Sequence, residues 1–407
     1  MGSKKSILVV CDYFVPGYRA GGPVKSIFNL LCALSGEFSF LVFSRDRDLG
    51  DRHRYSDQRQ AAVVNQAPFA ILYASGSLFS LSYLKVLRRM KYDAIYLNSF
   101  FSPWQTLRYF VYRKLRMVPR VPILLAPRGE FATGALGIKR FKKAMYLFLT
   151  KDLLFTEQST VIWHASTPYE ADDIKRMRLL GRRVVNAGNS TRVAADVAGI
   201  HEVCDERRGE TNQFVRSGKK KEGALKIVFL SRVCKVKNLL FAIQVVRKLR
   251  CTVQFDIYGP MEDRSYWSLC QDAMRDVVPG IQIAYHGGVQ PSRVSEIFKR
   301  YHVMLLPTEG ENYGHVIVEA LLAGCPVIIS RTTPWRDLRE HNAGEDCPLG
   351  DEAAFINALS RFAAMDEAQL RESSAAALRY ALERCRIDEV VEANRVMLNE
   401  LVGIAHS

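Results

Sequence analysis

The chain has 407 residues, and its 57 Lys and Arg against 42 Asp and Glu leave a formal charge of +15. Its 48% hydrophobic and 24% charged residues are ordinary for a globular protein and exclude disordered, collagen-like and fibrous classes. At about 100–200 residues per domain, this length predicts two domains, each able to bury its own core. The positive charge leaves phosphate-bearing ligands, anionic membranes and nucleic acids open as partners.

The nine cysteines are spread along the chain without a C-x-x-C pair, which predicts reduced thiols and argues against a disulfide framework or a zinc site. Asp12 and Pro16 interrupt the short apolar run near the N-terminus, so the pattern differs from that of a signal peptide. No run approaches the roughly 18 apolar residues of a membrane span. We therefore expect a cytoplasmic protein, one that can still bind peripherally to the inner face of the plasma membrane.

Short apolar runs alternate with helical spacing through the first half of the chain, which is typical of an α/β fold. Because the runs are apolar throughout, they predict strands that are buried on both faces of a mostly parallel sheet. The expected strands span residues 6–12, 38–44, 69–74, 93–98, 121–127, 160–166 and 182–188.

The alternation stops in a polar, charge-mixed stretch that includes a short candidate helix over 193–200 and three lysines at 219–221, and then resumes. Strands are expected over 225–231, 252–259, 280–287, 302–308 and 326–330, and helices over 238–250, 265–277, 291–300 and 314–323. Residues 351–402 have helical spacing alone. We predict two doubly wound, Rossmann-like domains, 1–190 and 224–380, a linker over 191–223, and a terminal helix in 381–407 that packs back on the first domain.

Acidic residues surround the expected strand-to-helix turn in PTEGENYGHVIVEALLAGCPVIIS, residues 307–330. Glu311 lies in the loop, and Glu319 falls within the first two turns of the helix. The N–H groups around Tyr313, Gly314 and His315 lie at the helix start, where unpaired donors and the helix dipole favour an anion. The carboxylates suit sugar or ribose hydroxyls; alternatively, Glu311 only complements the helix dipole and Glu319 lies on a solvated face.

Two cations follow the first strand of the second domain. Arg232 and Lys237 are five residues apart in a loop at the carboxyl edge of the expected sheet. Such a pair can hold a diphosphate and stabilise the negative charge that develops as a phosphate leaves. A solvated basic loop is the alternative.

These motifs together resemble a known family. Ser231-Arg232-x4-Lys237-Asn238, Tyr258-Gly259-Pro260, Tyr285-His286-Gly287, Glu311-x7-Glu319 and Gly324-Cys325-Pro326-Val327 follow one another over residues 227–330. In order and spacing they resemble the C-terminal half of the GT-B retaining glycosyltransferases of glycosyltransferase family 4, the large family of sucrose-synthase-like and bacterial polysaccharide enzymes.

The resemblance implies roles for these residues. Arg232 and Lys237 would hold the diphosphate of a nucleotide-sugar, Glu319 the ribose hydroxyls, and Glu311 with the backbone of Tyr313, Gly314 and His315 the donor sugar. This chain has Glu311-Asn312-Tyr313-Gly314 where many relatives have Glu-Gly-Phe-Gly or Glu-Ser-Phe-Gly.

The first domain contains two further candidate donor-binding elements. The loop after the first strand contains Gly21 and Gly22, which allow close approach of backbone to a ligand and resemble the Gly-Gly loop of the family; a plain tight turn is the alternative. Arg128 follows the fifth strand, where many relatives have a histidine that contacts the donor sugar. We expect Arg128 to replace that histidine or to bind an acceptor phosphate.

Two other patterns have competing interpretations. Lys139, Arg140, Lys142 and Lys143 alternate with aromatic residues on an expected helix, which is either a solvated helix with a core face or a membrane-docking element. Asp46-Arg47-Asp48 matches the D-x-D triplet that binds a metal in the single-domain GT-A fold, but in this two-domain layout we interpret it as a chance match.

The resemblance implies a retaining glycosyltransferase, and because cations and helix-start amides can stabilise the leaving diphosphate, we expect it to be metal-independent and without a cofactor. It would transfer a sugar from a nucleotide-diphosphate-sugar to a saccharide or lipid-linked saccharide in cell-surface polysaccharide synthesis. The acceptor hydroxyl would lose its proton to a donor phosphate oxygen. Two alternatives stay open: a nucleic-acid-binding protein, disfavoured because its expected motifs are absent and the charge is dispersed, and a GT-B epimerase or sugar-nucleotide sensor.

Overall fold

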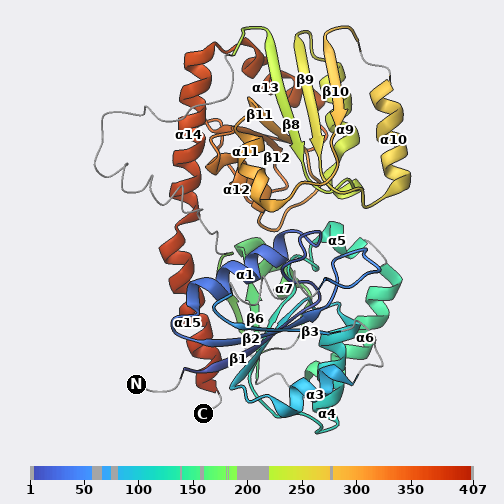
Figure 1. Ribbon diagram of the computed structural model, residues 1–407, viewed down its shortest axis with the longest axis vertical. Coiled ribbons are helices and arrows are strands. Elements are labelled where there is room, and N and C mark those ends of the chain that lie inside the picture. The colour runs from blue at the N-terminus through green and yellow to red at the C-terminus, as the bar shows by residue number, and fades with distance from the viewer. Residues whose placement is uncertain are drawn as a thin grey trace. The chain divides into compact units, whose positions relative to one another are not determined.

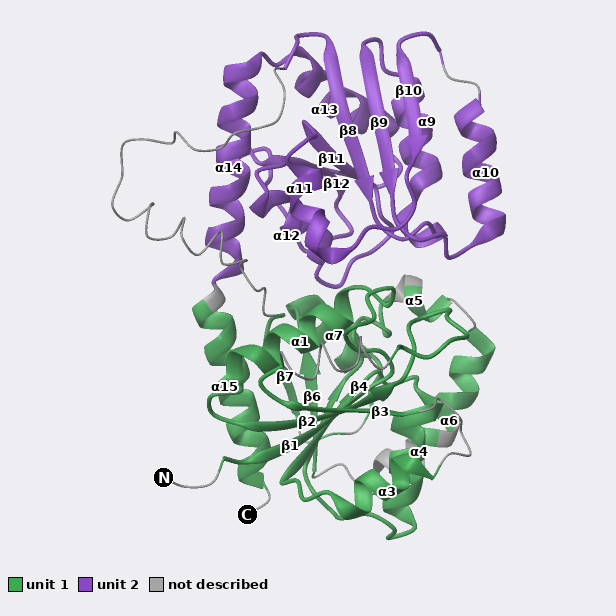
Figure 2. Cartoon of the chain, viewed as in Figure 1, with its two compact units in different colours: residues 1–191, 387–407 green, residues 192–386 purple. Residues whose placement is uncertain are grey.

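The computed structural model describes residues 4–56, 67–74, 81–137, 140–155, 160–179, 181, 183–189, 220–275 and 278–404. The chain forms two compact units, residues 1–191 with 387–407, and residues 192–386 (Figure 2). Each unit contains one parallel sheet flanked by helices (Figure 1). No described helix is long and apolar enough to cross a membrane.

The first unit contains a seven-stranded parallel sheet in the order β3-β2-β1-β4-β5-β6-β7. Its strands lie within two residues of the predicted ends, and the central ones are buried on both faces as their apolar sequences require. Their bounds are β1 (Ser6–Cys11), β2 (Ser39–Arg45), β3 (Ala70–Ala74), β4 (Ala94–Asn98), β5 (Ile123–Ala126), β6 (Val161–Ala165) and β7 (Arg183–Asn186).

Helices cover both faces of this sheet, so alternate residues of β1 lie in different cores. Ile7 and Val9 pack in a core with α1 and α15, and Leu8 and Val10 in a core with α3, α4, α6 and α7. The helices are α1 (Gly22–Leu34), α3 (Ser82–Arg89), a π-helical turn η1 (Pro103–Leu107), α4 (Arg108–Lys114), α5 (Thr133–Gly137), α6 (Arg140–Phe155), α7 (Pro168–Arg176) and α15 (Ile387–Gly403).

The second unit contains a six-stranded parallel sheet in the order β10-β9-β8-β11-β12-β13. The strands are β8 (Ala224–Leu230), β9 (Thr252–Tyr258), β10 (Ile281–Tyr285), β11 (Val303–Leu306), β12 (Val327–Ser330) and β13 (Gly344–Cys347). The edge strand β13 was not predicted, because Glu345 and Asp346 interrupt any apolar run there.

The helices of the second unit follow its strands. They are η2 (Lys235–Lys237), α9 (Leu239–Arg247), α10 (Arg264–Arg275), η3 (Pro291–Arg293), α11 (Val294–Phe298), α12 (His315–Leu322), α13 (Glu352–Ala364) and α14 (Glu367–Cys385). Arg386 adopts a left-handed conformation with φ 34° and separates α14 from α15. Residues 381–385 are therefore the end of α14, and the terminal helix begins at Ile387, later than the predicted 381.

Both sheets have a topological switch point, where successive strands are added on opposite sides. It lies between β1 and β4 in the first unit and between β8 and β11 in the second. Open α/β sheets bind ligands outside the carboxyl ends of the strands at such a point. The predicted residues of the second unit lie in the loops after β8 and β11 and in the first two turns of α12.

Candidate functional site

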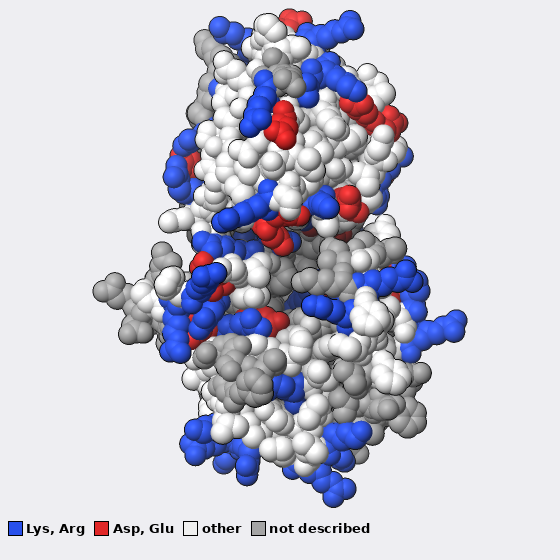
Figure 3. Space-filling view, turned by 90° about the vertical axis from the view of Figure 1, so that its right-hand side faces the viewer, with Lys and Arg blue, Asp and Glu red and all other residues white. Residues whose placement is uncertain are grey.

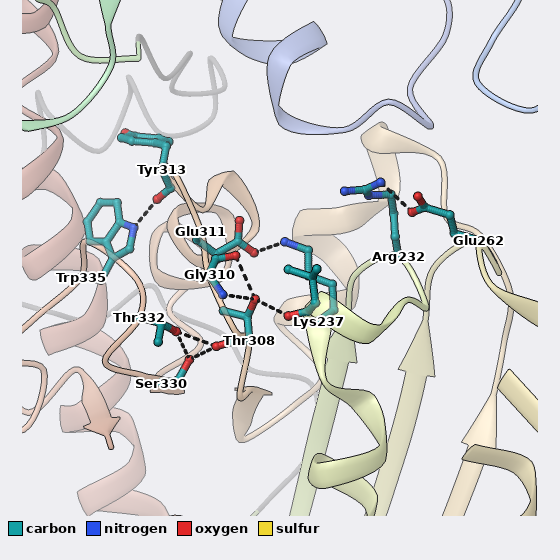
Figure 4. A network of polar contacts seen from close by, with 11 residues as sticks. Arg232, Lys237, Glu262, Thr308, Gly310, Glu311, Tyr313, Ser330, Thr332 and Trp335 are labelled. Carbon is teal, nitrogen blue, oxygen red and sulfur yellow. Dashed lines mark hydrogen bonds and ion pairs between the residues drawn. The ribbon is translucent and has the colours of Figure 1, made fainter. Parts of the chain in front are cut away.

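An ion pair joins the two loops at the switch point of the second sheet. Lys237 ends the turn η2 after β8, Glu311 follows β11, and the Lys237 ammonium contacts the Glu311 carboxylate (Figure 4). The two side chains are only 11% and 13% exposed. The structure thus brings two of the predicted residues together, each with the other as its counter-ion.

Hydrogen bonds around Thr308 fasten the Glu311 loop to its neighbours (Figure 4). The Thr308 hydroxyl donates to the Val236 carbonyl at 2.9 Å, and the Glu309 N–H donates to the same carbonyl at 2.7 Å. On the other side, the Thr332 hydroxyl donates to the Thr308 carbonyl at 2.6 Å. These contacts link the loops that follow β8, β11 and β12, so Lys237 and Glu311 are held by fixed backbone.

Arg232 lies in the same loop as Lys237 but has a different partner. Its Nη1 donates to Glu262 Oε2 at 2.6 Å, and both side chains are about a third or more exposed (35% and 44%). Glu262, in the loop after β9, was not predicted. This surface ion pair is weak enough for a ligand anion to compete with it.

Helix α12 begins directly after the Glu311 loop. Gly314, its N-cap, adopts a left-handed conformation with φ 79° and has no side chain of its own to cap the helix. The Trp335 indole donates to the Tyr313 carbonyl at 2.6 Å and fixes the approach of the chain (Figure 4). His315 and Glu319 are four residues apart and share one side of the helix. This start of α12 presents its positive dipole end beside Glu311.

A buried carboxylate that was not predicted lies one strand away. Asp256 in β9 accepts hydrogen bonds from His286 Nε2 at 2.7 Å and from the Tyr301 hydroxyl at 2.8 Å. Burial raises the pKa of Tyr301, so its hydroxyl stays a donor. The His286 ring stacks on Tyr258 with centroids 4.7 Å apart. The sequence signal that could have predicted this buried carboxylate is Asp256 itself, an acidic residue inside the mostly apolar run TVQFDIYG.

In the first unit, Arg128 is bonded to its own domain. Its guanidinium donates to Asn98 Oδ1 at 2.8 and 3.1 Å, to Asn189 Oδ1 at 2.9 Å and to the Tyr96 hydroxyl at 2.6 Å. Arg128 therefore ties the end of β4 to the segment after β7. These contacts hold the guanidinium in place, and its predicted contact with a donor sugar or an acceptor phosphate stays a prediction.

Two buried titratable groups lie near Arg128. The Tyr96 hydroxyl lies 2.6 Å from His164 Nδ1, and His164 Nε2 lies 2.8 Å from the Ala187 carbonyl. Burial, with the nearby Arg128 charge, lowers the pKa of His164 to about 3, so its imidazole is neutral. Burial raises the pKa of Glu130 to about 7, although that carboxylate accepts hydrogen bonds from Ser99 and from the N–H groups of Phe100 and Phe101.

Gly21 is the N-cap of α1 and Gly22 its first residue, so the predicted glycine loop ends at the start of the helix. Gly21 is the N-cap with φ 76°, and a side chain there would meet no atom within 4 Å. Asp48 shapes this loop, because its carboxylate accepts from the N–H groups of Tyr18 at 2.9 Å and Arg19 at 3.1 Å. Asp46 pairs with Arg54 at 2.9 Å. Both carboxylates of the D-x-D triplet thus have partners within the protein.

The basic clusters of the sequence differ in their surroundings. Lys139 and Lys219, with the candidate helix 193–200, lie outside the described residues. Lys220 is buried, and its ammonium donates to the Ala363 carbonyl at 2.8 Å, so it is not available to a membrane. Arg140 and Lys142 are exposed on α6, whereas the Lys143 ammonium donates to the Ala135 carbonyl at 2.7 Å.

Comparison with solved structures decides the fold. The Anabaena protein Alr3699/HepE, solved with UDP and glucose, superposes with a TM-score of 0.68 at 13% identity, covering 97% of this chain and 100% of that one. Sucrose-phosphate synthase from Thermosynechococcus elongatus gives a TM-score of 0.67 at 16% identity, covering 98% and 100%. The chain has the GT-B fold.

Two further comparisons concern the sequence. Residues 224–364 match the family model described as "Glycosyl transferases group 1". A Klebsiella pneumoniae protein described as an uncharacterized 41.2 kDa protein in cps region is 23% identical over 256 residues, 62% of this chain and 63% of its own length. The chain thus aligns with less than two thirds of that relative. Arg232, Lys237, Glu311 and Glu319 all lie within the segment that matches this family model.

Proposed function

We propose that this protein is a glycosyltransferase that takes a sugar from a nucleotide-diphosphate-sugar. The observation that carries the proposal is the Lys237–Glu311 ion pair at the carboxyl edge of β8 and β11, beside the start of α12. One cation, one carboxylate and a positive helix end suit a diphosphate joined to a sugar. The match of residues 224–364 to the group 1 glycosyltransferase model supports it, as does the likeness to a protein solved with UDP and glucose.

In the proposed reaction, the bond from the sugar C1 to the diphosphate oxygen breaks and a bond from C1 to the acceptor oxygen forms. Lys237, Arg232 and the start of α12 stabilise the diphosphate as it leaves, which is the role that fixed cations and dipoles perform. Because they supply this charge, we propose a metal-independent reaction without a cofactor. Glu319 binds the ribose hydroxyls, and Glu311 with the backbone of Tyr313 to His315 contacts the sugar.

We further propose that transfer retains the anomeric configuration, with the acceptor proton passing to the leaving phosphate oxygen on the same face. The acceptor is a saccharide, free or lipid-linked, in cell-surface polysaccharide synthesis at the cytoplasmic side of the membrane. The cps-region relative supports this setting. Gly21 and Gly22 would lie against the donor phosphate or the acceptor.

The experiment is a panel of nucleotide-sugars tested with saccharide acceptors, with nucleoside diphosphate release as the readout. We expect release only when donor and acceptor are both present, and a product whose anomeric proton coupling matches the donor. Lys237→Ala should lower turnover about 100-fold or more, while Lys235→Ala, an exposed lysine in the same turn, should not. Epimerised nucleotide-sugar, or release that is independent of any acceptor, would contradict the proposal.

A further inference from the structure

One side of helix α6 exposes large apolar side chains. Phe141, Met145 and Phe148 are 83%, 55% and 80% exposed. They are spaced i, i+4 and i+7, so they form one stripe along the helix. The opposite side holds the buried residues Tyr146 and Thr150, and the Tyr146 hydroxyl donates to the Phe100 carbonyl at 2.6 Å. The helix is therefore anchored by one side and presents a second apolar side to its surroundings.

Cations flank the exposed stripe. At about 100° per residue, Arg140 and Lys142 lie on opposite sides of the line through Phe141, and both are exposed. An apolar stripe between two cations is the pattern of a helix that lies in a membrane interface, where the apolar side chains enter the acyl boundary and the cations meet lipid phosphates.

The neighbouring helices continue this surface. Helix α4 packs against α6, and the rings of Tyr83 in α3 and Tyr112 in α4 lie 6.4 Å apart, so the three helices form one layer. Leu115, just after α4, is 62% exposed, and Leu81 and Met90, at the two ends of α3, and Met117 are exposed as well. The apolar surface is thus wider than one helix.

The charge of this layer is almost entirely positive. Between residues 81 and 120 the chain has nine Lys and Arg and a single acid, Asp93, whose carboxylate accepts from the Ser6 N–H at 2.7 Å and pairs with Lys5. Seven of the nine cations are exposed: Lys85, Arg88, Arg89, Lys91, Lys114, Arg116 and Arg120. In Figure 3, the lower end of the first unit, where α3 and α4 lie, shows Lys and Arg side chains.

We infer that the α3–α4–α6 face of the first unit docks on an anionic membrane surface. Phe141, Met145 and Phe148 enter the interface, and the surrounding cations bind lipid phosphates, each contributing affinity that falls with added salt. Nucleic acid is the less fitting partner, because the exposed apolar stripe of Phe141, Met145 and Phe148 lies beside the charges. The inference stands on the surface alone and does not depend on sugar transfer.

The test is cosedimentation of the full chain with vesicles of phosphatidylcholine mixed with phosphatidylglycerol, and with vesicles of phosphatidylcholine alone. We expect binding to the mixed vesicles, weakened by salt. The double variant Phe141→Ser and Phe148→Ser should weaken binding about tenfold or more, and Arg140→Glu with Lys142→Glu should weaken it about fivefold or more for each cation lost. Both pairs are exposed, so the variants should fold, which circular dichroism checks.

Matched controls change other exposed residues of the same kinds. Leu269→Ser, at 53% exposure in α10, and Arg293→Glu with Lys299→Glu, exposed in the second unit, should leave vesicle binding unchanged.

Equal loss in variants and controls, or no binding to anionic vesicles, would overturn the inference. A gel shift with oligonucleotides that is lost in the charge variants without any vesicle binding would overturn it in favour of nucleic acid. Concentration-dependent dimers abolished by the Ser variants, again without vesicle binding, would point to a second copy of the chain. The Lys237→Ala variant should still bind anionic vesicles. Its binding would show that membrane docking does not depend on the proposed sugar transfer.

Discussion

Single residues show how far the candidate site can be predicted. Lys237 and Glu311 were chosen because each follows a strand at the carboxyl edge of a sheet, and the structure places both there. Their pairing with each other, and that of Arg232 with Glu262, depends on how three separate loops meet at that edge. The spacing of residues within one loop does not predict which residues of other loops they will contact.

Arg128 shows the limit of an inference from one residue's position. It was predicted to contact the donor sugar or to bind an acceptor phosphate, and both stay predictions; its partners in the fold, Asn98 and Asn189, lie 30 and 61 residues away in the sequence. We expect Arg128→Lys to lower the free energy of unfolding by about 1–3 kcal/mol, because lysine cannot make the same set of hydrogen bonds. Urea unfolding measures this. A tenfold loss of nucleotide-sugar affinity at unchanged stability would instead support direct contact with the donor.

His164 predicts a pH dependence. Its folded pKa is about 3, against about 6.5 in the unfolded chain. Between those values the unfolded chain binds a proton that the folded protein does not, so this contribution to stability is lost as pH falls from about 6.5 toward 3. Against His164→Gln, which stays neutral, the wild type should lose about 1 kcal/mol per pH unit between about pH 6 and pH 4.

Unfolding of both proteins by urea at each pH measures the difference. Burial raises the pKa of Glu130 to about 7, so this group stabilises the folded protein more as the pH falls, which opposes the effect of His164. The wild type must therefore be compared with His164→Gln, in which the contribution of Glu130 is the same. A difference that does not change with pH would show that His164 is protonated in the folded state or accessible to water.

The positions of helices and strands were easier to predict from the sequence than the contacts of individual side chains. Buried parallel strands have long apolar runs, so their positions were predicted to within two residues, except for the acidic edge strand β13. Residues 291–300, predicted as one helix, form the turn η3 followed by the five-residue helix α11. Pro291 at its start favours the tighter turn.

A substitution at Gly259 tests how tightly the chain packs at the end of β9. It follows β9 with φ 141°, and a Cβ atom there would lie 1.8 Å from the Ser231 carbonyl oxygen. We expect Gly259→Ala to destabilise the second unit by about 3 kcal/mol or more, since both the backbone and its neighbour must move. Gly288→Ala is the control, because its nearest atom would be 4.0 Å away. Equal denaturant midpoints for the two variants would show that this loop rearranges freely.

At the scale of the whole molecule, the chain crosses between units twice. Residues 387–407 belong to the first unit, and α15 supplies Met397, Leu398, Leu401 and Val402 to the core beneath α1. Two domains could be predicted from the polar interruption near the middle of the chain. The residue at which the chain returns to the first unit could not be predicted, because α14 and α15 have the same helical spacing and are separated by the left-handed conformation of Arg386.

The terminal helix therefore predicts a stability effect on the first unit. Leu401 is fully buried in its core, and Leu401→Ala should lower the unfolding free energy of that unit by about 2–5 kcal/mol. Val396→Ala, at an exposed position of the same helix, should have little effect. Calorimetry that resolves the unfolding of the two units checks this. An unchanged first unit in the Leu401 variant would mean that α15 is dispensable to its core.

The proposed function requires that the Lys237–Glu311 edge binds a nucleoside diphosphate. Titration calorimetry with UDP, GDP and ADP measures this on the wild type, on Lys237→Ala and on the exposed control Lys235→Ala. We predict that the wild type and the control bind at least one of the three, and that Lys237→Ala binds it about tenfold or more weakly while remaining folded. Equal affinity in all three proteins, or no binding of any of the nucleotides by the wild type, would contradict a diphosphate site at Lys237.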